Sequence, residues 1–479
     1  MQICGGSETD FQHGIAQSEK TFSEQNSGDV NMEYIKEPSK RIPVIRDTDV
    51  CVLGGGCTGV FAAVRAARLG MRVLLIEQAG MLGGAAVTGL VNIWHTLMDT
   101  EDREQIIAGL TEEVIALLQK RGALTVQQNR SSTYNFNPME LAIFLDELIR
   151  ENGIDLMLHT SYSAVSSGDG RVQAVFVENK DGRGAVRASF FIDATGDGLA
   201  ARDLGLPLYV HDYVQPPTAV FHLQGDMRGV DVDRLVKERG REFGLADDWG
   251  WNTHVAGLEG ITMRADQHIF GVRCDRADDL TRAETEGRRM IRGFVSLLRA
   301  YGRPDSNYAV ANMCSSLGLR ETVHFRTRFC ATETSLLTGE RYEAPVMQGT
   351  YPVDVHHQDD GGISFKYLDG TRTTIWGKGT RTETGNWRQE AGLTGDPARY
   401  YQVPFDILVP PAFGNFAAVG RMVNADTGAF GALRVMVNLN QLGEAAGTAA
   451  ALCLDQGKTI QELDGSDVTR TLRKGGSAL

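Results

Sequence analysis

Three glycines near the start of the chain, Gly54, Gly56 and Gly59, have the spacing of a loop that holds a diphosphate. In such a loop the first glycine makes a tight turn, the second lets the backbone approach the diphosphate, and the third lets a helix pack closely on a strand. Glu77 follows about 20 residues later, where a carboxylate can hydrogen-bond a ribose hydroxyl. These residue types in this order predict that the chain binds an adenine dinucleotide.

The elements that must position these residues are visible around them. Residues 50–53 form an apolar strand before the glycines, residues 58–70 carry the apolar stripe of a helix, and residues 72–76 form a second strand that ends on Glu77. The helix N-terminus offers unpaired N–H groups and a partial positive charge to the phosphates. Because strand, loop, helix, strand and acid follow one another, the pattern is more specific than the glycines alone.

Composition limits the classes of partner. The 479 residues are enough for roughly two or three domains. A formal net charge of −13 argues against nucleic acid or an anionic membrane as the main partner. No apolar run is long enough to cross a bilayer and no secretory signal is visible, so we expect a cytoplasmic protein without a membrane partner. The cysteines form no C-x-x-C pair, which argues against the usual cluster-ligating and dithiol patterns.

Composition and the placement of glycine motifs divide the chain into four predicted segments. Residues 1–33 are polar and are expected to form a disordered extension. Residues 34–204 and 403–479 carry the glycine-rich motifs and are expected to build one dinucleotide-binding domain from two parts. Residues 205–402 contain no second Gly-x-Gly-x-x-Gly and are expected to form a substrate or cap domain.

Periodicity predicts the remaining elements and the fold class. Further helices are expected at 104–121, 138–152, 231–241, 280–301 and 434–453. Further strands are expected at 154–159, 171–178, 186–193, 218–224, 267–273, 363–367 and 415–419. The predicted fold is α/β, a Rossmann-like cofactor-binding domain with an inserted α+β substrate domain.

Three further motifs follow the ribose acid in order. Gly83 and Gly84 come first, a strand then ends in the Ala-Thr-Gly-Asp turn at 194–197, and Gly420-Arg421 precedes a helix rich in alanine and glycine. This set resembles the FAD-dependent oxidoreductases with a glutathione-reductase-like FAD domain. In particular it is similar to the large bacterial family related to the flavin subunit of heterodisulfide reductase. The resemblance implies that the dinucleotide is FAD.

The resemblance covers most of residues 34–475 and includes two more specific pieces, Leu317–Thr322 and Tyr351–His356. The chain lacks the cluster cysteines of the heterodisulfide reductase subunit, so that electron-transfer role is not carried over. The family's motif positions imply a cofactor-binding set in this sequence. Its members are Gly54, Gly56, Cys57, Thr58, Gly59, Glu77, Gln78, Gly83, Gly84, Thr195, Gly196, Asp197, Gly420, Arg421 and Asn438.

Candidate catalytic residues are His95, His356 and Arg434. His95 could face the flavin ring or be a core histidine beside Trp94, and both interpretations are open. His356 follows Asp354 by two residues on a predicted strand, so the carboxylate could fix its tautomer or simply form a structural bond. The resemblance implies that Arg434 begins a helix aimed at the N1–C2=O edge of the flavin, with a surface ion pair as the alternative.

Two further questions concern charged groups. Arg320 could clamp a substrate carboxylate or form a structural ion pair with Glu321 or Asp354. His356 and His357 are adjacent and point apart on a strand, so no metal site is expected there or elsewhere.

We therefore predict an FAD-dependent oxidoreductase that transfers a hydride between a small organic substrate and flavin N5. The electron acceptor is unidentified, and a homo-oligomer is one alternative for the assembly. The rival functions are a flavin monooxygenase or halogenase, and an electron-transfer flavoprotein that serves a partner protein.

Overall fold

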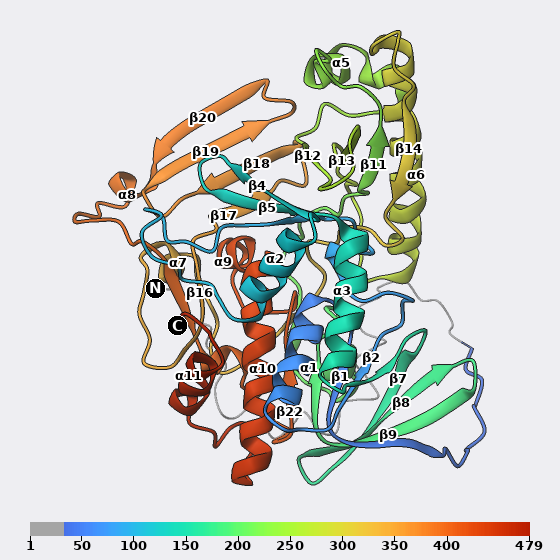
Figure 1. Ribbon diagram of the computed structural model, residues 1–479, viewed down its shortest axis with the longest axis vertical. Coiled ribbons are helices and arrows are strands. Elements are labelled where there is room, and N and C mark those ends of the chain that lie inside the picture. The colour runs from blue at the N-terminus through green and yellow to red at the C-terminus, as the bar shows by residue number, and fades with distance from the viewer. Residues whose placement is uncertain (1–32) are drawn as a thin grey trace. The chain divides into compact units, whose positions relative to one another are not determined.

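The central sheet holds the strands that flank the glycine loop. The computed structural model describes residues 33–479, so residues 1–32 of the predicted extension lie outside the described residues. The sheet has seven strands in the order β6-β2-β1-β9-β8-β7, with β22 beside β9 (Figure 1). Its strands are β1 (Val44–Leu53), β2 (Val73–Ile76), β6 (Asp155–Met157), β7 (Ser161–Gly168), β8 (Arg171–Asn179), β9 (Gly182–Asp193) and β22 (Phe416–Ala418).

The strands β6, β2, β1, β9 and β22 pair in parallel and form the Rossmann-like part of the sheet. Residues 50–53 of β1 are fully buried, because a central parallel strand is covered on both faces. The strands β7 and β8 extend this sheet in antiparallel fashion. The structure therefore confirms the predicted α/β fold class and the two strands predicted on either side of the glycine loop.

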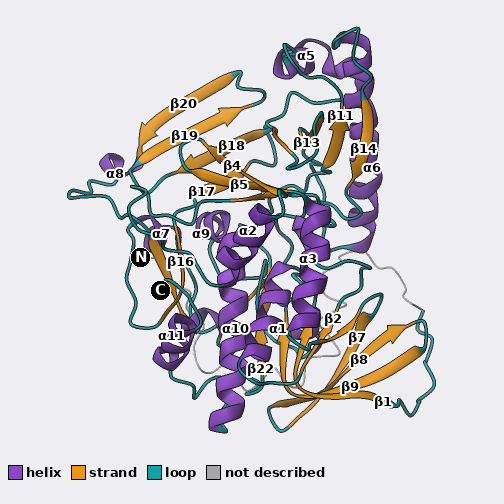
Figure 2. Cartoon of the chain, viewed as in Figure 1, coloured by secondary structure: helices purple, strands orange, loops and turns teal. Residues whose placement is uncertain are grey.

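Helices cover the central sheet, and Figure 2 shows α1, α2, α3 and α10 gathered together over its strands. The helices are α1 (Cys57–Arg68), α2 (Leu110–Lys120), α3 (Pro138–Glu151), α4 (Leu199–Asp203), α5 (Val232–Arg239), α6 (Ala277–Tyr301), α7 (Glu333–Leu337), α8 (Trp387–Glu390), α9 (Thr427–Leu433), α10 (Met436–Gln456) and α11 (Gly465–Lys474).

The helix after the glycine loop and the long C-terminal helix pack against each other at very short range. Gly443 and Gly447 of α10 face the backbone of Thr58 and Ala62 in α1, where any Cβ atom would overlap a carbonyl oxygen. A buried ion pair between Arg65 and Glu444 joins the same two helices. Residues far apart in sequence thus fix α10 against the helix that follows the glycine loop.

The segment predicted as the substrate domain contains small antiparallel sheets, and the two four-stranded ones, β12-β13-β11-β14 and β17-β18-β19-β20, lie above α1 and α10 in Figure 1. The remaining strands are β3 (Ile93–Trp94), β4 (Leu124–Gln128), β5 (Ser132–Phe136), β10 (Leu208–Tyr209), β11 (Phe221–Gln224), β12 (Trp251–His254), β13 (Ile261–Ala265), β14 (Ala309–Met313), β15 (His324–Phe325), β16 (Pro345–Gly349), β17 (Val353–His356), β18 (Gly362–Lys366), β19 (Thr371–Trp376), β20 (Arg381–Asn386) and β21 (Tyr401–Pro404).

Two predicted elements are wrong in place or length. The strand expected at 267–273 is absent there, and β13 lies earlier, because the backbone N–H of His268 donates to the carboxylate of Asp248 at 2.5 Å. The helix expected at 104–121 begins only at Leu110, after Gly109 with a φ of 67°. A residue at positive φ cannot continue a right-handed helix, which sets the start of α2.

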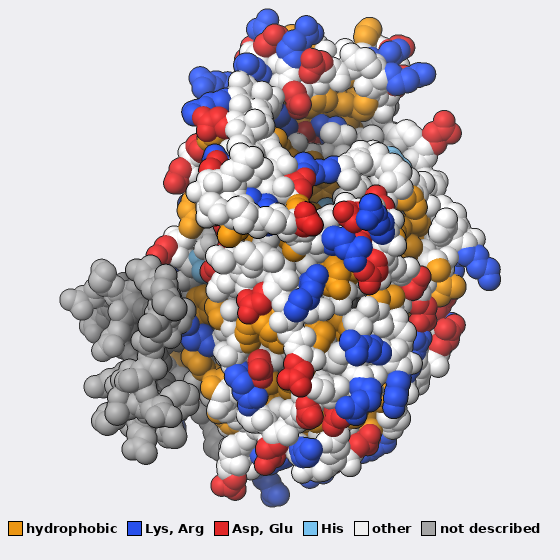
Figure 3. All heavy atoms as spheres, turned by 90° about the vertical axis from the view of Figure 1, so that its left-hand side faces the viewer, with side chains coloured by type: hydrophobic (Ala, Val, Ile, Leu, Met, Phe, Trp, Pro, Cys, Tyr) orange, Lys and Arg blue, Asp and Glu red, His pale blue; other side chains and the backbone are white. Residues whose placement is uncertain are grey.

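Residues 44–479 form one compact unit, and the described residues 33–43 belong to a separate one. The proposed domain boundaries at 204/205 and 402/403 stay predictions. Across residues 33–479 no helix combines the length and the apolar character needed to span a bilayer. On the face shown in Figure 3, basic and acidic side chains are interspersed, and they form no continuous basic patch on that face.

Candidate active site

A cavity of about 790 Å³ lies at the carboxyl ends of the parallel strands β1, β2, β9 and β22. The residues that follow these strands, among them Gly54, Glu77, Ala194 and Gly420, line its wall. Ligands of doubly wound α/β folds bind at this edge of the sheet. The cavity then continues past the start of α10 to residues of the inserted segment, including Trp249 and His356.

All predicted cofactor-binding residues line this cavity except Gly59 and Asn438. Asn438 is buried, and its amide nitrogen donates to the hydroxyl of Tyr401 at 3.0 Å and to the carbonyl of Ala432 at 2.9 Å. A Cβ at Gly59 would overlap the carbonyl oxygen of Gly54. Both residues therefore lie off the cavity wall, and their placement there is corrected: Gly59 serves the packing of α1, as the third glycine of the motif predicts, and Asn438 serves the packing of α10.

The glycine loop leaves room for a diphosphate. Gly54 has a φ of 98°, which favours glycine, and a Cβ at Gly56 would meet no atom within 4 Å because it would project into the cavity. The amide of Gly83 donates to the carbonyl of Gly55 at 2.8 Å, which holds the second glycine motif against the first. The backbone at Gly56 is thus open to a ligand on its cavity side, and these residues fit a dinucleotide.

The carboxylate of Glu77 is held in place by backbone donors. One oxygen accepts from Gly55 N at 2.6 Å and the other from Ala79 N at 2.7 Å. Each carboxylate oxygen can accept a further hydrogen bond. Since Glu77 lines the cavity, a ribose hydroxyl can donate to it without displacing either backbone bond.

The Ala-Thr-Gly-Asp turn and the Gly420-Arg421 turn are joined beside the cavity. The guanidinium of Arg421 pairs with Asp197 at 2.5 Å, and the hydroxyl of Thr322 donates to the same carboxylate oxygen at 2.9 Å. This contact fixes two cofactor-side turns to the segment that carries Arg320. Sequence reasoning placed both turns near the cofactor but gave no role to Thr322.

The start of α10 faces the cavity, where Val435, Met436 and Leu439 line the wall. The helix begins at Met436, one residue after an N-cap that has no side-chain hydrogen bond. Its first-turn N–H groups therefore offer partial positive charge to a ligand. The helix predicted at 434–453 corresponds to α10, and a short helix that was not predicted, α9, ends just before it at Leu433.

His95 lines the cavity and packs against the ring of Tyr351, with ring centroids 4.1 Å apart. Burial, and after it the nearby Arg434 cation, lowers the pKa of His95 to about 3. The imidazole is therefore neutral at physiological pH. Trp94 is turned into the core against Phe61 and Phe136, so His95 is not a core residue like its neighbour.

His356 also lines the cavity, on the same side of β17 as Asp354, as the spacing predicts. Its Nε2 atom lies 3.3 Å from Asp354 Oδ1, while His356 Nδ1 and Asp354 Oδ1 are buried without a hydrogen-bond partner. Burial, and then the charge of Arg320, lowers the pKa of His356 well below its ordinary value. The ring is therefore neutral and has one free nitrogen. His357 points elsewhere and contacts Asp360.

Arg434 forms an ion pair with Asp354, with its Nη2 atom 3.1 Å from Oδ2. The pair is buried beside the cavity, so the surface alternative is wrong. Tyr351 donates to the same Asp354 oxygen at 2.7 Å. The Nε atom of Arg434 is buried without a partner, which leaves this cation with an unused donor at the cavity wall.

Arg320 lines the cavity, and its Nη1 atom donates to the carbonyl of Pro216 at 2.8 Å and to the hydroxyl of Thr218 at 2.7 Å. Burial, followed by the charge of Arg434, lowers the pKa of Arg320 to about 9. The guanidinium thus remains charged at neutral pH. Glu321 points away from Arg320 and contacts two histidines instead, so the expected Arg320–Glu321 ion pair is not formed.

Aromatic side chains form part of the wall on the inserted side, and sequence reasoning missed them. Trp249, Trp251 and Phe365 line this end of the cavity. Trp249 packs edge-on against His356, with ring centroids 5.5 Å apart, and against Phe365 at 6.2 Å. These residues come from separate strands and loops without a shared spacing, so no local signal in the sequence groups them.

A sequence model of the family described as FAD dependent oxidoreductase matches residues 49–472. Dihydrolipoamide dehydrogenase of Chaetomium thermophilum is 31% identical over 105 residues, which cover 16% of this chain and 21% of that protein. Thiamine thiazole synthase of Desulfosudis oleivorans is 30% identical over 158 residues, 31% of this chain and 56% of the synthase.

A probable electron transfer flavoprotein-quinone oxidoreductase of Escherichia coli is 27% identical over 201 residues, 38% of this chain and 46% of that protein. The chain spans about a fifth to just over half of the length of these relatives.

Solved structures also resemble the chain. A geranylgeranyl bacteriochlorophyll reductase-like protein from Thermoplasma acidophilum gives a TM-score of 0.43 at 11% identity, with 90% of this chain and 82% of that chain covered. A myxobacterial chondrochloren halogenase gives a TM-score of 0.42 at 13% identity, with 90% and 78% covered.

Proposed function

This chain belongs to the FAD-dependent oxidoreductases, and from that premise we propose that it transfers a hydride between a small organic substrate and N5 of bound FAD. The proposal rests on one observation: a single cavity has different residues at its two ends. Glycine loops that suit a dinucleotide form one end, and polar and aromatic side chains of the inserted segment form the other. FAD supplies the two-electron chemistry, and the chain supplies binding, orientation and proton handling.

The cofactor side has a part for each portion of a dinucleotide. The backbone at Gly54 and Gly56 holds the diphosphate, and Glu77 accepts from the adenosine ribose. The start of α10 and the guanidinium of Arg434 line the cavity and would face the N1–C2=O edge of a bound flavin. Negative charge at that edge is stabilised by a helix N-terminus and by a cation.

The substrate side favours an organic acid. Trp249 and Phe365 give this end a flat apolar wall, and Arg320 and Arg434 place two cations beside it. A guanidinium binds a carboxylate through paired, charge-assisted hydrogen bonds. The Nε atom of Arg434 is a buried donor without a partner, and a carboxylate would satisfy it. We therefore assign the substrate class as small carboxylates with an apolar or unsaturated body.

His356 is the proton acceptor in this proposal. When the substrate loses a hydride to the flavin, it also loses a proton, and the free Nδ1 of neutral His356 takes that proton. The Arg320 charge helps to keep the pKa of His356 low in the free protein. A bound carboxylate opposes that charge, so the pKa of His356 rises toward the working range only when substrate is present.

The relation to the flavin subunit of heterodisulfide reductase is part of this proposal. It is supported by the two more specific motifs, because Leu317–Arg320 and Tyr351, Asp354 and His356 all line the cavity. Without the cluster cysteines, the shared feature is the flavin site and its surroundings.

A second candidate is electron transfer to a partner, favoured by the match to the flavoprotein-quinone oxidoreductase. In that case the protein oxidises its substrate but passes electrons to a quinone or a protein. The rival oxygen chemistry would instead show rapid reoxidation by oxygen coupled to oxygenation or halogenation of an added substrate.

The test is anaerobic reduction of the purified yellow protein with a panel of small carboxylic acids, followed through the visible absorbance of the flavin. Each acid is paired with its amide, which has the same body without the charge. We expect bleaching with at least one acid and none with its amide. Arg320→Met should weaken the response, whereas Arg130→Met, at an exposed arginine paired with Asp369, should not.

Protein that binds no FAD after reconstitution would refute the cofactor side of the proposal. Equal reduction by acids and amides would refute the carboxylate assignment alone. Slow reoxidation by oxygen but fast reoxidation by a quinone would favour the second candidate.

A further inference from the structure

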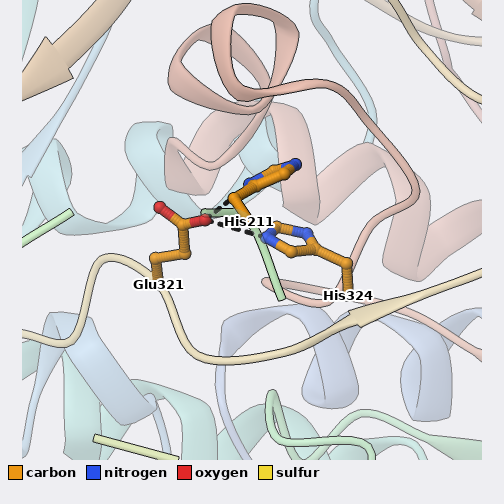
Figure 4. A group of neighbouring side chains, drawn as sticks. All are labelled: His211, Glu321 and His324. Carbon is orange, nitrogen blue, oxygen red and sulfur yellow. Dashed lines mark hydrogen bonds and ion pairs between the residues drawn. The ribbon is translucent and has the colours of Figure 1, made fainter. Parts of the chain in front are cut away.

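Two histidines and a glutamate meet outside the cavity wall, in a group formed by His211, Glu321 and His324 (Figure 4). The short ladder between β10 and β15 brings them together, because it pairs Tyr209 with His324 and so places His211 beside that ring. Glu321 precedes His324 by three residues. None of these three side chains is among the described residues that line the cavity. The group is therefore separate from the flavin site.

The three side chains point their polar atoms at one place. The Nδ1 atom of His211 lies 2.6 Å from Oε1 of Glu321, and the Nε2 atom of His324 lies 3.0 Å from the same oxygen. One ligand atom from each residue lies within 4.8 Å of the other two. Figure 4 shows both rings directed at the carboxylate from different segments.

The outward nitrogens determine where the ring protons sit. The Nε2 atom of His211 lies 2.9 Å from the carbonyl oxygen of Ala425, and Nδ1 of His324 lies 3.0 Å from that of Val423. A carbonyl oxygen can only accept, so a neutral ring carries its proton on the outward nitrogen. The inward nitrogens then carry lone pairs that face a carboxylate oxygen.

Three electron-pair donors that face one another can bind a cation between them. Histidines that bind metals commonly donate their second ring N–H to a backbone carbonyl, which fixes the tautomer and the ring orientation. Both histidines of this group have that arrangement. The other oxygen of Glu321 accepts from Gln215 N at 2.9 Å, so the carboxylate is oriented as well.

We propose that His211, Glu321 and His324 bind a divalent first-row transition metal, of the class of Zn²⁺ or Fe²⁺. Two imidazoles and one carboxylate are ligands of that class. The side chains of Glu321 and His324 are fully buried, and that of His211 is 11% exposed, which leaves an entry on one side only. Phe430 packs against the ring of His324 at 4.6 Å and keeps it from turning.

The metal would hold the segment that carries Arg320. Glu321 follows Arg320 directly, and Thr322 then contacts Asp197 at the cofactor side. Fixing Glu321 therefore positions Arg320, which lines the cavity, on one side and Thr322, which contacts Asp197, on the other. The role is structural, and the inference does not rest on hydride transfer or on the identity of the substrate.

The test uses the full-length flavoprotein purified without chelators or added metals. Elemental analysis should find about one zinc or iron per chain, since a preformed site binds its metal stoichiometrically. After chelator treatment, added Co²⁺ should give visible bands at wavelengths beyond the flavin absorbance, and Zn²⁺ should abolish them. Chelation should lower the melting temperature of the wild-type protein and leave its FAD content unchanged.

Glu321→Gln keeps the size and removes the anionic ligand, so metal content and the Co²⁺ bands should fall at least about tenfold. His357→Asn is the matched control, because His357 also contacts a carboxylate, at Asp360, but lies outside the group. That variant should keep its metal. A wild-type protein that binds none of the three metals, or Glu321→Gln protein with wild-type metal content, would overturn the proposal. The wild-type measurements stand even if the variant does not fold.

Discussion

The two ends of the cavity are built from different parts of the polypeptide. At the end beside β1 and β2, the wall is largely backbone and small residues, and Glu77 has both oxygens already bonded to backbone amides. At the end beside β17, the wall consists of large side chains. His356, Asp354 and Arg434 each have a buried polar atom without a hydrogen-bond partner there.

This difference between the two walls indicates which end of the cavity binds a ligand that changes during turnover. A buried polar atom without a partner costs roughly 1–3 kcal/mol, so several together in a cavity wall favour a ligand that completes them. A wall of backbone and small residues suits a cofactor that is the same in every turnover. A wall of unsatisfied side chains suits a substrate that enters and leaves.

The largest effect is expected at the glycine loop, where two neighbouring glycines serve different purposes. Gly59→Ala places a Cβ on the carbonyl oxygen of Gly54 and should destabilise the fold by about 3 kcal/mol or more. Gly56→Val projects into the cavity instead, so the fold should persist while FAD affinity drops roughly a hundredfold, or about 2.7 kcal/mol. Thermal unfolding and FAD titration separate the two. Wild-type FAD affinity in Gly56→Val would contradict the assignment of this end of the cavity to the cofactor.

The next effect concerns the substrate end. His356→Asn should slow flavin reduction by an active acid by about a hundredfold or more, because a general base contributes that much, while FAD content stays at the wild-type level. Anaerobic stopped-flow absorbance measures the rate. His357→Asn is the control, since that ring contacts Asp360 and Ser364 instead of the cavity. A rate unchanged by His356→Asn would remove His356 from proton transfer.

Arg434 lies where the two ends meet, and its loss should change the flavin itself. Without the cation, Arg434→Met should lower the two-electron reduction potential by about 30 mV, equivalent to about 1.4 kcal/mol. Equilibration with a dye of known potential measures the shift. Arg434→Lys keeps the charge and should recover most of the wild-type potential. Equal potentials in all three proteins would place Arg434 away from the flavin.

His95 should make stability depend on pH in a defined window. Its pKa is lowered from 6.5 to about 3 in the folded protein, so between these values the unfolded chain binds more protons. Stability contributed by neutral His95 is therefore fully present above pH 6.5 and is lost as the pH falls toward 3. The slope approaches about 1.4 kcal/mol per pH unit for one proton. Denaturant unfolding at several pH values should show a shallower slope for His95→Asn, and an identical slope would contradict this.

The smallest effect is expected at Cys57. Burial raises the pKa of its thiol to about 12, and the thiol donates to the carbonyl of Gly83 at 3.5 Å. The residue is thus a protonated packing group, although it stands at a helix N-terminus. Cys57→Ala should change FAD affinity by less than about threefold, or roughly 0.7 kcal/mol, in the same titration. A much larger loss would mean that the sulfur contacts the cofactor.

Much of the cofactor end followed from the sequence alone. The strand, glycine loop, helix and acid of residues 50–77 are contiguous, and their spacing reports local backbone geometry. The same reasoning placed Gly59 and Asn438 at the cavity, which the structure corrects. At Gly59 the decisive neighbour, Gly54, is only five residues away, but at Asn438 it is Tyr401, which no local pattern links to α10.

The substrate end and the proposed metal group depend on tertiary structure. Trp249 and Phe365 reach the cavity from different strands and loops, and His211 meets Glu321 across 110 positions because β10 pairs with β15. Spacing along the chain predicts the local secondary structure of one backbone segment. Which distant side chains converge, and which of their atoms remain without a partner, is decided only when the sheets pack.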